Sequence, residues 1–149
     1  HVTVCDINEK MLSVGRDRAI NKGQLENLTW ICGDAAALPI PKCYADIYVT
    51  AFCLRNATDL QAALKEARRI LKPGGRFICL EFSKIDIKLW NKLYDLYSFH
   101  VLPLLGQIVA NDRSAYQYLV ESIRKFPSKE EFSEMILEAN LEHLGSQPG

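Results

Sequence analysis

The amino-acid sequence predicts an α/β domain in which a parallel β-sheet carries helices on its faces. Two observations predict this fold class. The first half of the chain alternates between short apolar stretches, typical of strands, and segments with helical periodicity. The segment from Arg69 to Ser83, RILKPGGRFICLEFS, then joins the end of a helix to an apolar strand through Pro73 and two glycines. Crossover helices connect to parallel strands in this way, and ligands in such sheets bind beyond the carboxyl ends of the strands.

The predicted elements begin at the first residue. His1–Cys5 is β-branched and apolar and predicts a strand. Asn8 is placed to cap a helix that runs to about Lys22 and stops at Gly23. Leu28–Cys32, with the sequence LTWIC, predicts a second strand.

A second strand–helix–strand unit follows a loop rich in alanine and proline. Ala45–Phe52 predicts a third strand, and Asp59 is placed to cap a helix that ends at Leu71 and keeps one apolar face. Arg76–Phe82 predicts a fourth strand with a lone acid, Glu81, near its exit.

The pattern becomes helical and aromatic after about residue 86. We expect a helix over Ser114–Lys125 and a last helix opened by a capping box at Ser128. The expected organisation is one partial domain with an α/β part (1–86), a helical segment (87–127), and a C-terminal helix and tail (128–149).

Composition excludes several classes of protein. Lys+Arg and Asp+Glu both total 18 in 149 residues, so no net charge attracts nucleic acid or an anionic membrane surface. The longest uncharged run, between Asp95 and Asp112, contains Pro103 and Gly106 and does not predict a membrane span. The five cysteines show no metal-ligand spacing, so we expect structural thiols in a reducing compartment and no metal site.

Two acids follow successive predicted strands. Asp6 can accept both hydroxyls of a ribose, and Asp34 can accept from an adenine amino group. Each also has a structural interpretation, a helix cap for Asp6 and a turn residue after Gly33 for Asp34. Together they indicate an adenosine pocket more strongly than either does alone.

The loop after the third predicted strand carries Arg55 and Asn56, which are the polar groups expected to face a substrate. The alternative is a solvated loop held by the Asp59 cap. His100 lies in an apolar helical stretch, where a packed histidine is more common than a base, and the aromatic run from Trp90 to Phe99 fits either core packing or an apolar tunnel.

Several stretches resemble the ubiquinone/menaquinone biosynthesis C-methyltransferases, which use S-adenosylmethionine. The resemblance extends from His1 to about Glu142. Within the family, HVTVCDIN and YQYLVESIR look most like the animal mitochondrial enzymes, which methylate 2-methoxy-6-polyprenyl-1,4-benzoquinol. The stretches that carry the family resemblance are HVTVCDINEKML, GDAAALP, AFCLRNATD, RILKPGGRFICLEFSK, LYDLYSFHVLPLLG and YQYLVESIRKFPSKEEF.

The resemblance implies a Rossmann-like class I S-adenosylmethionine-dependent methyltransferase fold. Asp6 would hold the cofactor ribose, and Asp34 with Ala35 the adenine. The segment 87–127 would be a substrate lid in which Tyr97 and His100 contact the substrate and apolar helices take the polyprenyl tail.

The sequence also departs from the family pattern. No glycine-rich turn precedes Asp6, and the family's first strand, which lies between the strands ending at Asp6 and Phe52, is missing. The last residues, LEHLGSQPG, do not continue into the family's terminal strand pair, so we expect a fragment of a longer enzyme. Cys53 stands where a glycine would allow close backbone approach, so the resemblance does not fix the path of that loop.

The expected reaction is C-methylation of the polyprenylated benzoquinol. Arg55 is a poor base because its guanidinium stays protonated, so we expect it to stabilise a developing phenolate and, with Asn56, to orient a water that takes the proton. Two alternatives remain at this point, a methyltransferase with another small-molecule acceptor and a non-catalytic scaffold subunit.

The resemblance also implies partners and a location. The partners would be the quinol substrate, other quinone-biosynthesis proteins in a peripheral membrane complex and a second copy in a homodimer, with no nucleic acid. The location would be the matrix face of the mitochondrial inner membrane, or the cytoplasm for a bacterial source.

Overall fold

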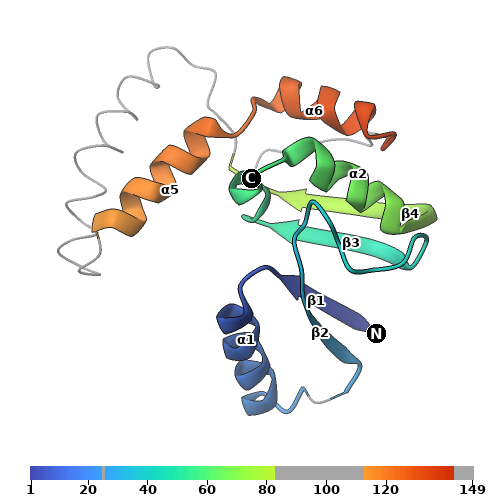
Figure 1. Cartoon of the computed structure of the whole chain (residues 1–149), viewed down its shortest axis with the longest axis vertical. Helices are drawn as coiled ribbons and strands as arrows, with labels where there is room; N and C mark the ends of the chain where they lie inside the picture. Colours follow the sequence, from blue (N-terminus) through green and yellow to red (C-terminus); the bar gives the residue numbers. More distant parts are fainter. Residues whose placement is uncertain (25, 83–112, 143–149) are drawn as a thin grey trace.

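The structure is a computed structural model that describes residues 1–24, 26–82 and 113–142. In these residues strands and helices alternate, and a helical segment follows (Figure 1). The elements are β1 (Val2–Asp6), α1 (Glu9–Asn21), β2 (Leu28–Cys32), β3 (Ala45–Ala51), the short 3-10 helix η1 (Leu54–Asn56), α2 (Leu60–Ile70), β4 (Leu71–Leu80), α5 (Arg113–Lys125) and α6 (Lys129–Glu138).

Both strand ladders in the described residues are parallel, which confirms the predicted α/β class. β1 pairs with β2, and β3 pairs with β4, as two separate ladders. No ladder joins β1 to β3 within the described part of the chain, so the sheet is interrupted where the resemblance places the missing strand. The final residues, 143–149, lie outside the described residues.

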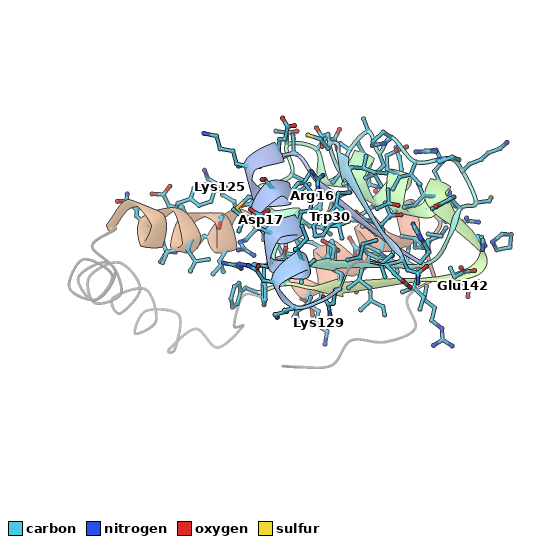
Figure 2. The ribbon with its side chains drawn as sticks, turned by 90° about the horizontal axis from the view of Figure 1, so that it is seen from below. Arg16, Asp17, Trp30, Lys125, Lys129 and Glu142 are labelled. Carbon is cyan, nitrogen blue, oxygen red and sulfur yellow. The ribbon has the colours of Figure 1, made fainter. Side chains whose placement is uncertain are left out.

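Local sequence signals explain where α1 begins and ends and how it packs on the β1–β2 pair. The Asn8 side chain accepts hydrogen bonds from the backbone N–H groups of Lys10 and Met11, and Gly23 follows the helix with a positive φ of 68°. Trp30 of β2 lies close to Arg16 of the helix, and both line one surface hollow (Figure 2). A Cβ on Gly15 would approach Trp30 to 2.8 Å, so only glycine lets the helix lie this close to the ring.

One face of the β3–β4 pair is covered and the other is exposed. α2, capped by Asp59, packs its apolar side over β4, and Leu64 of this helix has no exposed surface. The opposite face presents two apolar side chains from each strand to solvent, at exposures of 48–62%. These side chains, Ile47, Val49, Ile78 and Leu80, are the exposed sheet face.

The junction between α2 and β4 differs from the prediction. The expected start of the strand at Arg76 and end of the helix at Leu71 are wrong, because Leu71 already pairs with Ala45. The register then jumps to the pair Ile47–Arg76, so Lys72–Gly75 forms a bulge inside one long strand. The predicted Pro-Gly-Gly turn therefore lies within the strand, with Gly74 at a φ of 78°.

The second strand spans Leu28–Cys32 as predicted, whereas boundaries of the first, third and fourth strands shift by one or two residues. The first strand is Val2–Asp6 instead of His1–Cys5, and the third ends at Ala51 instead of Phe52. The fourth ends at Leu80, so Phe82 lies beyond it. These differences are small because strand ends depend on pairing partners that the local sequence does not contain.

The C-terminal helices pack onto α2 and η1. Phe126, between α5 and α6, forms a buried cluster with Leu54 and Ala63. Its ring lies 5.1 Å from that of Phe132 in α6, and Ser128 forms the predicted capping box. One core therefore connects the helical segment to the loop that follows β3. None of the helices in the described residues is long and apolar enough to cross a membrane.

Candidate functional site at the carboxyl ends of the strands

The cofactor-binding residues predicted from the sequence lie together at the carboxyl end of the β1–β2 pair. Asp6 ends β1 beside Cys32, and Asp34 follows β2 by two residues. The backbone N–H of Gly33 donates to the carbonyl of Asp6 at 3.1 Å, which holds the two strand ends together. Ala35 packs against the cluster that contains Leu54 and so links this end to the loop after β3.

Asp6 is positioned by a tight local turn. Its Oδ1 accepts a hydrogen bond of 2.7 Å from the backbone N–H of Asn8. The cap of α1 is Asn8 itself, so the alternative in which Asp6 caps this helix is wrong. No other hydrogen bond to the Asp6 carboxylate occurs in the described part of the chain, which leaves its Oδ2 available to a ligand.

Asp34 sits in a turn of its own. Its Oδ1 accepts from the backbone N–H of Ala36 at 2.9 Å, and its carbonyl accepts from Ala37 at 3.0 Å. The predicted turn is therefore present, and within residues 1–24, 26–82 and 113–142 the second carboxylate oxygen has no partner. Burial, together with nearby Asp6, Cys32 and Asp34, raises the pKa of the Cys5 thiol, which lies between the two strand ends.

Arg55 is held by an ion pair that sequence reasoning did not assign to the site. Its Nη1 donates to Oε2 of Glu81 at 3.0 Å, with side-chain exposures of only 12% and 5%. The backbone N–H of Arg55 also points to Oε1 of the same carboxylate, at 3.5 Å. The lone acid at the end of an apolar strand was a usable signal, because a buried carboxylate requires a cation or several donors.

Two stacked aromatic rings lie beside the charged group of Arg55. The rings of Phe52 and Phe82 stack with centroids 4.8 Å apart, and the guanidinium carbon lies 5.6 Å from each centroid. The Nε of Arg55 is buried without a hydrogen-bond partner. The structure thus fixes a positive charge at the end of β3 and leaves its Nε–H donor without an acceptor.

Asn56 lies beside this pair and is exposed. Its Oδ1 accepts a hydrogen bond of 2.7 Å from the hydroxyl of Tyr118 in α5. Tyr118 was not predicted as a site residue, although it lies in the YQYLVESIR stretch that carries the family resemblance. No local periodicity could place it against a residue 62 positions away.

The loop path at Cys53 is ordinary for a residue with a side chain. Cys53 has a φ of −107°, and its thiol lies 3.2 Å from the carbonyl of Ala51. The left-handed residue of the loop is Phe52, with a φ of 56°. A bulky residue at positive φ costs backbone energy and is held in place by its surroundings, here by ring stacking and a backbone bond to Leu80.

The cysteines only partly match the expectation of buried structural thiols. Cys79 is the clearest case, because burial raises its pKa to about 12 and so keeps it neutral and unreactive. Cys32, Cys43 and Cys53 are exposed, and all five thiols are free.

Two further predictions concern the substrate and a metal. Tyr97 and His100, the predicted substrate-binding residues, lie outside the described residues. The described residues contain no cluster of three or more histidine, cysteine or acidic side chains suited to a metal. Two surface hollows, of about 670 and about 230 Å3, lie beside the amino ends of β1 and β2 and beside α1, and neither is lined by the site residues.

Comparisons with known proteins agree with this geometry. The ubiE/COQ5 methyltransferase family matches residues 1–147. The chain is 54% identical over 144 residues to the mitochondrial 2-methoxy-6-polyprenyl-1,4-benzoquinol methylase of Bos taurus, covering 97% of this chain and 44% of that protein. Its identity to the Oryza sativa subsp. japonica protein of that name is 52% over 145 residues, covering 96% and 49%. The chain thus spans less than half the length of these relatives.

Solved structures resemble the fold over nearly all of the chain. The YcgJ protein from Bacillus subtilis has a TM-score of 0.64 at 23% identity, covering 92% of this chain and 50% of that one. A SAM-dependent methyltransferase from Aquifex aeolicus has a TM-score of 0.61 at 16% identity, covering 93% and 57%. At these identities the likeness concerns the fold alone, a class I S-adenosylmethionine-dependent methyltransferase fold with a partial sheet. The match of the family across residues 1–147, with more than half of the residues identical in its relatives, shows that the chain belongs to the ubiE/COQ5 methyltransferase family.

Proposed function

We propose that this protein transfers a methyl group from S-adenosylmethionine to a ring carbon of 2-methoxy-6-polyprenyl-1,4-benzoquinol in ubiquinone biosynthesis. The names of the close relatives support the reaction. The observation that carries the proposal in this chain is the fixed guanidinium of Arg55 beside the exposed amide of Asn56 at the end of β3. A fixed positive charge and an amide donor suit a reaction in which a ring oxygen becomes negative.

The residues at the β1–β2 end fit the nucleoside part of the cofactor. Asp6 and Asp34 each keep one carboxylate oxygen free after their local hydrogen bonds are made. The free oxygen of Asp6 would accept from the ribose hydroxyls, and that of Asp34 from the adenine amino group with Ala35 alongside. When bound, the cofactor supplies an electrophilic methyl group on its sulfonium centre.

The residues of the β3–β4 end would act on the quinol. Arg55 stays protonated, so its role is to stabilise the phenolate that forms when a water takes the hydroxyl proton. Electron density would then move to the neighbouring ring carbon, which would bond to the methyl group as the methyl–sulfur bond breaks and a neutral thioether leaves. The ring proton would pass to water to restore aromaticity, and the phenolate would regain a proton from solvent. The Arg55–Glu81 pair is largely buried beside the rings of Phe52 and Phe82, and this low exposure would strengthen its electrostatic effect.

Arg55→Ala in the complete protein tests this assignment. We expect kcat to fall by about 10²–10³-fold, as for loss of an oxyanion-stabilising donor. The measurement is methyl transfer to a short-chain benzoquinol followed by mass spectrometry, with the exposed Arg16→Ala as the matched control. Unchanged turnover, with folding and cofactor affinity retained, would remove Arg55 from the mechanism. Absence of transfer by the unaltered complete protein would contradict the proposed function itself.

The relatives' names also support a mitochondrial location. We propose a peripheral location at the matrix face of the inner membrane, because a polyprenylated substrate would reside in a membrane. A homodimer and contacts with other proteins of quinone biosynthesis are further parts of this proposal, which rest on the family resemblance alone. Co-sedimentation with inner-membrane vesicles, lost after a high-salt wash, tests a peripheral association.

A further inference from the structure

The contact between α5 and the loop after β3 is made by a tyrosine that is mostly exposed. The hydroxyl of Tyr118 donates to Oδ1 of Asn56 at 2.7 Å, although 58% of the tyrosine is exposed to solvent. Other residues of α5 and the residue that follows it anchor this helix by burial. Val120 and Ser122 are each only 5% exposed, and Phe126 belongs to the buried cluster with Leu54. The helix is therefore held without Tyr118, whose hydroxyl has a contact of its own with the loop.

This contact gives the asparagine amide a direction. An asparagine side chain has one acceptor oxygen and two N–H donors. With Oδ1 accepting from the Tyr118 hydroxyl, the Nδ2 group is the other branch of the planar Asn56 amide and has no partner in the described part of the chain. Asn56 thereby offers donors and not an acceptor, next to the fixed cation of Arg55.

The direction matters for the proposed reaction. An oxygen that gains negative charge is stabilised by donors and destabilised by a facing carbonyl oxygen. A freely rotating amide would present either group, and part of its effect would be lost in reorientation. An amide oriented in advance presents the donor before the charge forms.

We propose that Tyr118 is a positioning residue for methyl transfer. By donating its hydroxyl proton to Oδ1 of Asn56, it holds the Nδ2 group outward as a donor to the phenolate oxygen of the quinol. This inference rests on the proposed function, because it names how one residue of that site is oriented.

Tyr118→Phe removes only the hydroxyl and tests the proposal. We expect kcat to fall about 2- to 10-fold, the effect of one hydrogen bond, with KM for the quinol little changed. Tyr44→Phe is the matched control, because Tyr44 is 49% exposed and precedes β3, away from the site. The control should keep the kcat and the thermal midpoint of the unaltered protein.

A double-mutant cycle separates positioning from a structural role. In an Asn56→Ala background the tyrosine has no amide to orient, so Tyr118→Phe should cause no further loss of kcat. An equal loss in both backgrounds, or a kcat in Tyr118→Phe equal to that of the unaltered protein, would overturn the proposal while leaving the proposed function intact. Failure of the unaltered protein to methylate the quinol would instead overturn the proposed function.

A second readout does not depend on turnover. In protein labelled with 15N-asparagine, the side-chain NH2 resonances of Asn56 should shift in Tyr118→Phe and stay in place in Tyr44→Phe. Unchanged Asn56 resonances in Tyr118→Phe would show that the hydrogen bond is absent in solution and would overturn the proposal.

Discussion

At the end of the β1–β2 pair, Asp6 and Asp34 are each held by a backbone N–H two residues further along the chain. At the end of the β3–β4 pair, Arg55 is held by a carboxylate 26 positions away, and Asn56 by a hydroxyl 62 positions away. The first end is thus assembled from local turns, and the second from contacts between distant elements. Substitutions should therefore affect function alone at the first end, and function together with stability at the second.

Removing Glu81 is expected to have the largest effect and tests whether the β3–β4 end contributes to stability. Glu81→Ala leaves the guanidinium of Arg55 buried without its partner, so the free energy of unfolding should fall by about 3–5 kcal/mol. Urea denaturation monitored by circular dichroism measures this free energy of unfolding. Glu81→Gln keeps an acceptor of the same shape, so it should lower the free energy of unfolding by less than Glu81→Ala does.

The matched control is an exposed ion pair. Asp46 pairs with Lys72 at 2.8 Å, with side-chain exposures of 79% and 45%, and Asp46→Ala should leave the unfolding midpoint unchanged. Equal destabilisation by Glu81→Ala and Asp46→Ala would contradict the view that burial makes the Arg55–Glu81 pair different.

A substitution at Asp6 should separate binding from stability. Asp6→Asn keeps an Oδ1 that accepts from the backbone N–H of Asn8, so the turn survives. It removes the charge that strengthens hydrogen bonds to the ribose, so affinity for S-adenosylmethionine in the complete protein should fall by about tenfold or more. Calorimetric titration measures the affinity, with the exposed Asp17→Asn as control. A lower thermal unfolding midpoint together with unchanged affinity for S-adenosylmethionine would contradict this prediction, because Asp6 would then serve stability and not cofactor binding.

The smallest expected effect concerns the cap of α1. Asn8→Ala removes the side chain that accepts from Lys10 and Met11, and should cost about 1 kcal/mol of unfolding free energy. The backbone N–H of residue 8 still donates to Asp6, so cofactor affinity should stay the same. A loss of affinity comparable to that of Asp6→Asn would show that the cap and the carboxylate act as one unit.

This difference between the two ends also explains what could be predicted from the sequence. The cap at Asn8, the stop at Gly23 and the acids at the strand ends follow from residues within a few positions of one another. The Arg55–Glu81 pair and the Tyr118–Asn56 hydrogen bond depend on the register of β4 and the path of α5, which no local pattern contains. The bulge at Lys72–Gly75 was missed for the same reason, because the Pro-Gly-Gly signal marks a turn without showing that Leu71 is already paired.

The interrupted sheet has a consequence for behaviour in solution. Each strand of the two separate ladders leaves one row of backbone N–H and C=O groups without a ladder partner in the described residues, and Ile47, Val49, Ile78 and Leu80 form an apolar surface beside two of those rows. Unprotected edges next to apolar side chains are templates for pairing between molecules. A polypeptide that paired with β1 and β3 along these edges would therefore do more than add hydrogen bonds, because it would also prevent edge-to-edge pairing between molecules.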